Sequence, residues 1–141
     1  EGIKPQTEEV IKILKNSKTP FIIAANKIDL ISGWRSNKEI PIIKNLDEQS
    51  SSVSLDFEKK LYGLIAKLSI FGFNLDRFDR VEDYTKKIAI VPTSAKTGEG
   101  FAELLMILSG LAQKYLEKSI KINVTRYGTL ICCVYINTMW F

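Results

Sequence analysis

The first part of the chain combines a helical pattern of apolar positions with a short continuous apolar run. Residues 4–18 (KPQTEEVIKILKNSK) have a proline in the first turn, acids near the start and lysines near the end, which predicts a helix. Residues 21–25 (FIIAA) are apolar and partly β-branched, as is typical of a strand covered on both faces. The stretch from Ile31 to about Ser54 is irregular and polar, and we predict a long loop or insertion there.

The rest of the chain repeats this alternation. Ser54 can cap a helix, and apolar residues with helical spacing follow it: Phe57, Leu61, Leu64, Ile65 and Leu68. Residues 72–84 (GFNLDRFDRVEDY) are interpreted as a charged connector with aromatic anchors, and residues 87–93 (KIAIVPT) as a second buried strand. A turn, SAKTGEG, precedes a further helix, whose predicted apolar face consists of Phe101, Leu104, Leu105, Leu108, Leu111, Ala112, Tyr115 and Leu116.

This order of elements predicts an α/β fold with a parallel sheet flanked by helices. After Ile120 the pattern changes to β-branched residues, KINVTRYGTLICCVYIN, which we expect to form a strand that opens another domain. The predicted division is therefore residues 1–122 for the α/β unit and residues 123–141 for the start of a following domain.

Composition narrows the class of protein without naming a function. The 141 residues correspond to one domain, and a hydrophobic fraction of 45% with 26% charged residues excludes disordered, collagenous and disulfide-rich classes. The net charge of +4 and pI near 9.0 fit an RNA-rich neighbourhood, but no basic run is concentrated enough to exclude an ordinary solvated surface. No apolar run is long enough to cross a bilayer.

Three further features of the sequence limit the kinds of catalytic or metal site that this chain could contain and the kind of protein it could come from. The sequence contains no histidine, which excludes any mechanism within this chain that uses imidazole as a base or ligand. Cys132 and Cys133 are adjacent, so they predict neither a disulfide nor a zinc site and are compatible with a reducing cytoplasm. The first residue is Glu1 rather than methionine, and we expect the chain to be a piece of a longer protein.

Polar residues follow both predicted strands at the point where each strand ends. Asn26, Lys27 and Asp29 come directly after the first strand, and residues 94–96 (Ser-Ala-Lys) come after the second. Ligands of open α/β sheets bind beyond the carboxyl ends of the strands, so neighbouring parallel strands would bring both groups to one rim. Asn and Asp after a strand are also common turn formers that bond to their own backbone, and this alternative interpretation needs no ligand.

A guanine base would suit the first of these interpretations. The Asp29 carboxylate can accept two parallel hydrogen bonds, and guanine offers two such donors, its N1–H and its exocyclic amine. Adenine has a lone pair at N1 and would leave the carboxylate unpaired, and a site of this kind rejects such an analogue by roughly 10⁴-fold. The stem of Lys27 could lie across the base plane. Backbone N–H groups of Ser94, Ala95 and Lys96 could donate to the guanine O6.

The segments Asn26-Lys27-Ile28-Asp29 and Ser94-Ala95-Lys96 resemble the fourth and fifth guanine-recognition motifs of the GTPase superfamily of P-loop proteins. Longer strings narrow the resemblance: EGIKPQT, ANKIDLISGWR, GFNLDRFDRVEDY, VPTSAKTGEGFAELL and GLAQKYL. They are similar to the later half of the GTPase domain of the archaeal and eukaryotic translation initiation factor two family, known in eukaryotes as factor five-B. The resemblance covers about residues 1–122, and the Gly33-Trp34-Arg35 continuation is specific to that branch.

The resemblance implies a partial G domain that lacks its N-terminal strands and P-loop. It implies that the intact protein binds GTP and Mg²⁺, promotes joining of ribosomal subunits with initiator tRNA in place, and hydrolyses GTP in the cytoplasm, with no membrane or DNA partner. Asn26, Lys27 and Asp29 would recognise the base, and residues 94–96 would complete the pocket. The family continues into a β-barrel, of which TRYGTLICC is a faint echo, so we expect residues 123–141 to be an aberrant or truncated start of that barrel.

The phosphate-binding part of such a site is missing from the sequence. No G-x-x-x-x-G-K-[ST] loop occurs, so the chain has no loop of that kind for phosphates and no Ser or Thr for Mg²⁺. We therefore predict no catalytic and no metal-binding residue here, and a chain that alone neither hydrolyses GTP nor holds it tightly. Two alternatives stay open: a non-catalytic remnant or interaction module that binds no nucleotide, and part of another ribosome-associated GTPase.

Overall fold

The computed structural model describes residues 5–17, 20–84, 86–120 and 132–136. Its four strands form one parallel sheet in the order β2-β3-β1-β4. These strands are β1 (Phe21–Ala25), β2 (Leu75–Arg77), β3 (Ile88–Pro92) and β4 (Cys132–Ile136). β1 is central, with Ala25 aligned with Pro92 of β3 on one side and with Ile136 of β4 on the other.

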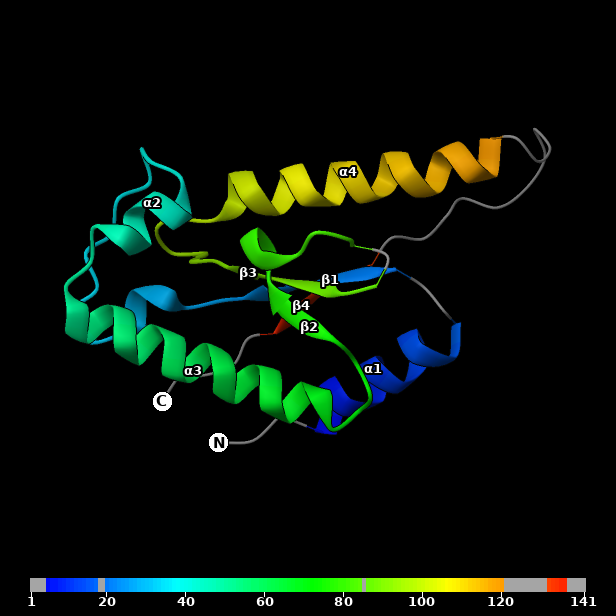
Figure 1. The fold of residues 1–141 in the computed structure, drawn as a ribbon, viewed down its shortest axis with the longest axis horizontal. Helices are drawn as coiled ribbons and strands as arrows, with labels where there is room; N and C mark the ends of the chain where they lie inside the picture. Colours follow the sequence, from blue (N-terminus) through cyan, green and yellow to red (C-terminus); the bar gives the residue numbers. More distant parts are fainter. Residues whose placement is uncertain (1–4, 18–19, 85, 121–131, 137–141) are drawn as a thin grey trace.

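Helices cover both faces of this sheet. Figure 1 shows α4 (Phe101–Ile120) along one face and α1 (Pro5–Ser17) with α3 (Ser51–Ser69) along the other. The short α2 (Ile42–Asp47) lies at the end of the sheet where the loops after β1 and β3 also lie. This layered α/β arrangement confirms the predicted fold class.

The core follows from the sequence of β1. All five of its residues are buried, as expected of a strand with helices above and below. The helices contribute regularly spaced apolar side chains, among them Phe57, Leu61, Leu64 and Leu68 of α3. Of the predicted set on this helix, Ile65 is partly buried and packs against the core. Residues that belong to no regular strand or helix also join it, including Ile31, which is 2% exposed.

Most predicted elements lie where the sequence placed them, with two differences in the face of α4. The helix at residues 4–18 is observed as α1, and the two strands at residues 21–25 and 87–93 as β1 and β3. On α4, Leu104, Ile107 and Leu111 face the core, whereas Leu105 is 60% and Phe101 37% exposed. The prediction that Leu105 and Phe101 lie on the buried face was wrong, because the buried stripe runs through Leu104, Ile107 and Leu111 at spacings of i+3 and i+4. The side chains of Tyr115 and Leu116, the last two of the predicted face, lie outside the described part of the chain.

The predicted loop between Ile31 and Ser54 contains a helix and the start of the next one. α2 spans Ile42–Asp47, and α3 begins at Ser51 with Ser50 as its N-cap residue, so Ser54 lies inside the helix instead of capping it. The pattern hid α2 because Asn45, a polar residue, is buried on its inner face. A six-residue helix offers one buried apolar pair at helical spacing, Ile42 and Leu46, and one such pair is too short a pattern to predict a helix.

The predicted connector at residues 72–84 also contains regular structure. β2 pairs in parallel with β3, and a 3₁₀ turn, η2 (Phe78–Arg80), follows it. Two of the three residues of β2 are charged, so the apolar signal of a strand is missing. β2 is an edge strand, and charged residues are usual there.

β4 lies in the same sheet as β1, and the two pair in parallel over Cys132–Ile136. The division of the chain near residue 122 stays a prediction, as does the assignment of residues 123–141 to a following β-barrel. Most of the predicted tail lies outside the described residues.

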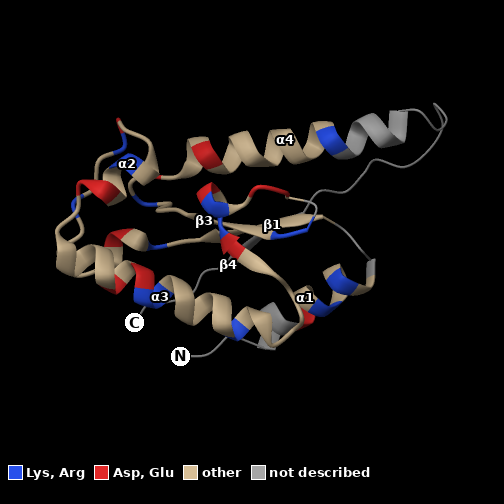
Figure 2. Ribbon diagram, in the orientation of Figure 1, with Lys and Arg blue, Asp and Glu red and all other residues tan. Residues whose placement is uncertain are grey.

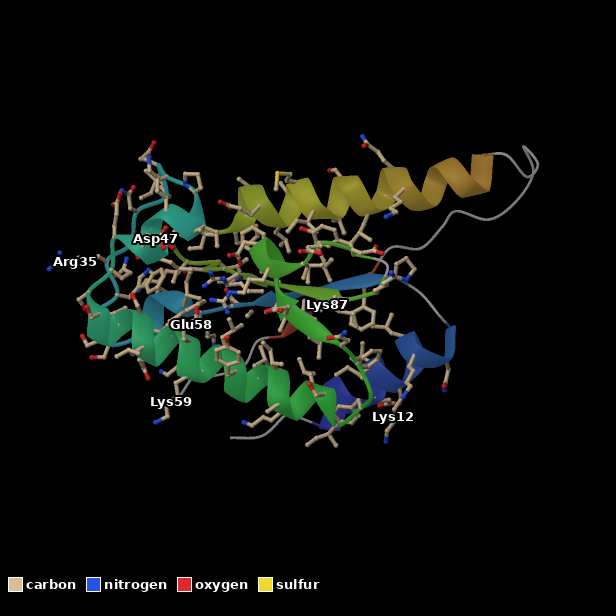
Figure 3. The ribbon with its side chains drawn as sticks, in the orientation of Figure 1. Lys12, Arg35, Asp47, Glu58, Lys59 and Lys87 are labelled. Carbon is tan, nitrogen blue, oxygen red and sulfur yellow. The ribbon has the colours of Figure 1, made fainter. Side chains whose placement is uncertain are left out.

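The surface carries charges of both signs. Acidic and basic residues occur together on α3 and on α4 (Figure 2). Lys12 and Lys59 extend away from the body of the molecule, and Arg35 does so at the end near α2 (Figure 3). In the part of the chain that the structure describes, no helix is long and apolar enough to cross a membrane.

Candidate functional site

The two polar strand ends lie together at one rim of the sheet. β1 and β3 are parallel neighbours, and the backbone N–H of Thr93 donates to the carbonyl oxygen of Ala25 at 2.9 Å. Beyond this bond, the N–H of Ile28 donates to the carbonyl oxygen of Thr93 at 3.2 Å, which holds the loop after β1 against the end of β3. Residues 26–29 and 94–96 are therefore tied to each other by the backbone at the point where both strands end.

Asn26 links the first loop to the second through its side chain. It is only 4% exposed, and its Oδ1 accepts a hydrogen bond from the backbone N–H of Ala95 at 2.9 Å. A buried amide needs such partners, since an unsatisfied polar group in the interior is costly. Of the three N–H groups expected to face a guanine O6, two donate within the protein: that of Ala95 to Asn26, and that of Ser94 to the Glu99 carbonyl at 3.0 Å. The Lys96 N–H is the one of the three that has no protein acceptor among the described residues.

Asp29 and Ser94 make the second link. The Ser94 hydroxyl donates to Asp29 Oδ1 at 2.5 Å, while the same hydroxyl oxygen accepts the backbone N–H of Thr97 at 3.2 Å. Because the Thr97 N–H donates to the Ser94 oxygen, the hydroxyl hydrogen is free to be directed to Asp29. Asp29 Oδ2 accepts no hydrogen bond from any described residue, so this carboxylate keeps acceptor capacity for a ligand.

Lys27 has an unusual backbone conformation. Its φ of 73° lies in the left-handed region, and among the described residues it is the one non-glycine residue with a positive φ. This conformation costs roughly 1–2 kcal/mol for a residue with a Cβ. Strain of this kind is often found at functional sites, where the surroundings hold it in place. Here Leu30 donates to the Lys27 carbonyl at 3.1 Å, and the turn places Asp29 within reach of Ser94.

The second loop closes on itself through two glycines and Glu99. Gly98 donates to the carbonyl of Ser94 at 2.8 Å, and Ser94 donates to the carbonyl of Glu99 at 3.0 Å. Gly100 has a φ of +76°, and a Cβ there would lie 2.0 Å from the carbonyl oxygen of Pro92. Only glycine therefore allows the chain to pass this close to β3 before α4 begins.

Glu99 is the main residue of this site that the sequence did not reveal. It is 3% exposed, and its carboxylate accepts hydrogen bonds from four neutral donors: Trp34 Nε1, Asn37 N, Asn45 Nδ2 and Thr97 Oγ1. No described lysine or arginine forms an ion pair with it. An acid in a Gly-Glu-Gly turn is a faint signal in the sequence, since a turn normally exposes such a residue to water.

The segment between Ile31 and Ser50 folds against Glu99. Gln49 stabilises this segment from within, because its Nε2 donates to Asn45 Oδ1 at 2.9 Å and to the Arg35 carbonyl at 2.8 Å. Trp34 stacks at a tilt on Phe57 of α3, with ring centroids 6.4 Å apart. The polar insertion predicted from the sequence is thus an ordered segment that packs beside the two strand-end loops, residues 26–29 and 94–96.

A second polar cluster lies elsewhere, on β2 and α3, and it is a set of ion pairs. Arg77 contacts Asp79 at 2.5 Å and Glu58 at 2.8 Å, and Arg80 contacts Glu58 at 2.7 Å. Burial alone would raise the pKa of Asp79, but the Arg77 bond and the positive charges of Arg77 and Arg80 outweigh it and lower that pKa. These charges therefore form local ion pairs that join α3 to β2 and η2. Glu58 extends from α3 toward β2 in Figure 3.

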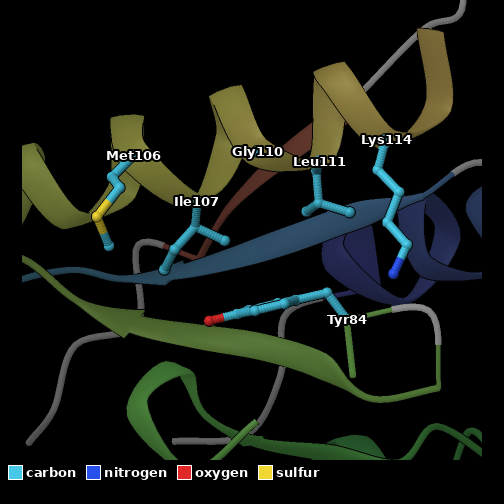
Figure 4. Close-up of a pocket in the computed structure, with 6 residues that line it drawn as sticks. All are labelled: Tyr84, Met106, Ile107, Gly110, Leu111 and Lys114. Atoms are coloured by element: carbon cyan, nitrogen blue, oxygen red, sulfur yellow. The ribbon is translucent and has the colours of Figure 1, made fainter. Parts of the chain in front are cut away.

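An apolar hollow of about 190 Å³ lies between α4 and Tyr84 (Figure 4). Its lining is formed by Tyr84, Met106, Ile107, Gly110, Leu111 and Lys114. None of these residues belongs to the two strand-end loops, and the hollow offers few polar groups. No group of three or more His, Cys, Asp or Glu residues is arranged to hold a metal ion in the described ranges. The candidate site is therefore the rim formed by residues 26–29 and 94–96.

Known proteins match this chain and this fold. The family model of the elongation factor Tu GTP binding domain matches residues 1–114. A probable translation initiation factor IF-2 of Methanopyrus kandleri is 50% identical over 128 residues, which are 91% of this chain and 21% of that protein. The corresponding factor of Thermococcus sibiricus is 52% identical over 124 residues, 88% of this chain and 21% of that protein.

A solved structure agrees with these sequence matches. The crystal structure of GDP-bound aIF5B from Aeropyrum pernix superposes with a TM-score of 0.79 at 46% identity, over 84% of this chain and 20% of that chain. This chain thus spans about a fifth of the length of the curated relatives that it matches. The parallel sheet with helices on both faces corresponds to part of a P-loop GTPase domain. The chain belongs to the elongation factor Tu GTP-binding-domain family, as a fragment of a translational GTPase of the initiation factor two type.

Proposed function

We propose that this chain supplies guanine-base recognition to a translation initiation factor. The observation that carries the proposal is the pair of side-chain links between the two loops, Asn26 to Ala95 and Asp29 to Ser94. They fix a carboxylate with a remaining acceptor oxygen beside a turn with a remaining backbone donor, that of Lys96. Guanine presents two donors, its N1–H and its exocyclic amine, and one acceptor, its O6. Asp29 Oδ2 and the second lone pair of Oδ1 can accept from the two donors, and the Lys96 N–H can donate to O6, so the two sets are complementary.

Each residue of the site has a distinct proposed role. Asp29 accepts hydrogen bonds from the Watson–Crick edge of guanine, and its Ser94 partner fixes the orientation of the carboxylate. Asn26 holds the second loop against the first, and the aliphatic stem of Lys27 covers the base plane. Residues 94–96 complete the pocket at O6.

The wider activity is proposed for the longer protein. The relatives are initiation factors, and the solved neighbour was crystallised with GDP, which supports guanine nucleotide binding as the chemistry of this family. On this basis the intact factor binds GTP and Mg²⁺, hydrolyses GTP, and acts in the cytoplasm on the ribosome in joining its subunits with initiator tRNA in place. The residues described here do not fit a Mg²⁺ site, so no step of hydrolysis is assigned to them.

A nuclear magnetic resonance titration tests the proposal on the 141-residue chain. We expect millimolar GDP to shift the backbone signals of Asn26, Asp29 and Ala95, and the same concentration of ADP to leave them in place. Equal shifts with both nucleotides, or shifts confined to other residues, would contradict the assignment. Micromolar GTP affinity of the isolated chain would contradict the separate prediction that this piece holds GTP only weakly.

A further inference from the structure

We propose that Glu99 is a positioning residue for the guanine site, through which the segment of residues 31–50 sets the base selectivity of Asp29. The inference deepens the proposed function and rests on it. The Glu99 side chain makes no hydrogen bond to Asp29 or to Lys96, the residues that would form hydrogen bonds with the base. It acts through a series of hydrogen bonds that begins at its carboxylate and ends at the carboxylate of Asp29.

The inner part of this series is short and directional. Thr97 Oγ1 donates to Glu99 Oε2 at 2.5 Å, the Thr97 N–H donates to Ser94 Oγ at 3.2 Å, and Ser94 Oγ donates to Asp29 Oδ1 at 2.5 Å. Each bond fixes the group that makes the next one. A Thr97 residue that lost its acceptor could turn, release the Ser94 oxygen and leave the Ser94 hydroxyl without a set direction.

The outer part connects Glu99 to the segment after the first loop. Asn45 Nδ2 donates to Glu99 Oε1 at 2.6 Å, the Asn37 N–H at 3.1 Å, and Trp34 Nε1 at 3.3 Å. A carboxylate that is 3% exposed needs these donors, because its charge has little water and, among the described residues, no cationic partner. Displacement of the segment would remove three of the four donors and would change the conformation of the loop that carries Ser94.

The same segment begins directly after the base-recognition loop. Ile31 follows η1 (Ile28–Leu30), and the Ile31 N–H donates to the Ile28 carbonyl at 3.0 Å. The segment is therefore attached to Asp29 by the backbone at one end and to Ser94 through Glu99 at the other. Its exposed tip, residues 35–39, lies outside the pocket, so anything that moves this tip can alter the pocket without touching the nucleotide.

Glu99→Gln tests the inference, with Glu103→Gln as the matched control. Glutamine has the shape of glutamate but carries no charge and replaces one carboxylate oxygen by an NH₂ group. At the Oε2 position this group would donate to Thr97 Oγ1 and reverse that bond, and at the Oε1 position it would oppose the three N–H donors. Glu103 also holds the segment, since its Oε1 accepts the Ile42 N–H at 2.8 Å, but it makes no contact with Thr97 or Ser94. Both variants would be studied in the full 141-residue chain, at a temperature where urea unfolding shows each to be folded.

The first readout needs no nucleotide. The Ala95 N–H is bonded to Asn26, so its hydrogen exchange reports whether the two loops stay joined. We expect exchange at Ala95 to rise by about tenfold or more in Glu99→Gln, which corresponds to about 1.4 kcal/mol of lost protection, and by less than about twofold in Glu103→Gln. Unchanged exchange at Ala95 in a folded Glu99→Gln protein would overturn the inference.

The second readout compares GDP with inosine diphosphate, which lacks the exocyclic amine. We expect the preference of the unmodified chain for GDP to fall by about tenfold in Glu99→Gln and to persist in Glu103→Gln. A preference that persists in Glu99→Gln would overturn the inference. No preference in the unmodified chain would instead refute guanine recognition itself, while the exchange data would still report on the coupling.

A milder variant covers the case in which Glu99→Gln does not fold. Trp34→Phe removes one donor to Glu99 and keeps an aromatic ring against Phe57. We expect it to raise exchange at Ala95 in the same direction by a smaller factor, about threefold. Exchange identical to that of the unmodified chain would overturn the proposed role of the segment.

Discussion

The carboxylate of Asp29 and the hydroxyl of Ser94, 65 residues apart in the sequence, form a hydrogen bond of 2.5 Å at the rim of the sheet. The bond exists because β1 and β3 are parallel neighbours, so that both strands end on the same side. It uses one oxygen of the carboxylate and leaves the other as an acceptor. The geometry of a candidate base-binding group thus depends on a residue in a distant loop.

Asp29→Asn in the longer initiation factor should change which purine is preferred. The Oδ1 of asparagine can still accept from Ser94, so the loops should stay joined. Its NH₂ group would face the exocyclic amine of guanine but would suit the oxygen that xanthine carries there. We expect GDP affinity to fall by about 100-fold or more and xanthosine diphosphate affinity to rise, as measured by competition binding.

The matched control for this change is Asp47→Asn. Asp47 is an exposed acid at the end of α2, and it makes no ion pair with any described residue. Its removal changes the net charge by the same amount without altering the pocket. Unchanged GDP affinity in Asp29→Asn, or an equal loss in both variants, would contradict the assignment of Asp29.

Gly100→Ala should destabilise the chain strongly. A Cβ at this position would meet the Pro92 carbonyl oxygen at 2.0 Å, and the residue has a φ of +76°. Left-handed strain and the steric clash together should lower the free energy of unfolding by about 2–5 kcal/mol, measured by urea denaturation.

Gly98→Ala separates the two causes. Gly98 has a φ of +83°, but no atom lies within 4 Å of a Cβ built there. This variant should therefore cost only the conformational strain, about 1–2 kcal/mol. Equal losses in the two variants would mean that the contact with Pro92 does not limit this turn.

The strand ends could be predicted from the sequence, whereas the support beneath them could not. β1 and β3 are continuous apolar runs, and the polar residues after them mark a rim in any parallel sheet. Glu99 gave no such signal, because its partners Trp34 and Asn45 are 65 and 54 residues away in the sequence. Buried polar pairing over such separations depends on the final fold and follows no period.

Short elements were missed for a related reason. α2 has a buried asparagine where an apolar residue would mark the helical face, and β2 has two charged residues among its three. Both are held by tertiary contacts, α2 through Glu99 and β2 through pairing with β3. Local propensity carries little information about elements that other parts of the chain stabilise.

Thr93→Val should leave stability unchanged or raise it. Thr93 is fully buried at the end of β3, and its hydroxyl has no hydrogen-bond partner among the described residues. Valine has nearly the same shape and removes the unsatisfied group, which should contribute up to about 1 kcal/mol to the free energy of unfolding. Thr97→Val is the control with the opposite sign, because it removes a donor to the buried Glu99. A loss of stability in Thr93→Val equal to that in Thr97→Val would refute this account.

The ion pairs around Asp79 should make stability depend on pH in acid. The pKa of Asp79 lies below its ordinary value of 3.8, since the Arg77 bond and the charges of Arg77 and Arg80 outweigh the opposing effect of burial. A folded protein with a lowered carboxyl pKa binds fewer protons than the unfolded chain between the two pKa values. The stabilisation by Asp79 is therefore fully present above pH 3.8 and is lost as the pH falls through the lower, folded-state value.

Asp79→Asn should remove this contribution. The side chain of Asp79 is 27% exposed, so solvent screening limits the effect to about 0.5–1 kcal/mol near neutral pH. Urea unfolding should show this difference between Asp79→Asn and the unmodified chain at about pH 7, and the difference should shrink at about pH 2 as Asp79 becomes protonated. Asp47→Asn, which breaks no ion pair with a described residue, should show little difference at either pH. A difference for Asp79→Asn that stays constant down to the lowest pH would mean that the Arg77 pair does not set the charge state of this carboxyl.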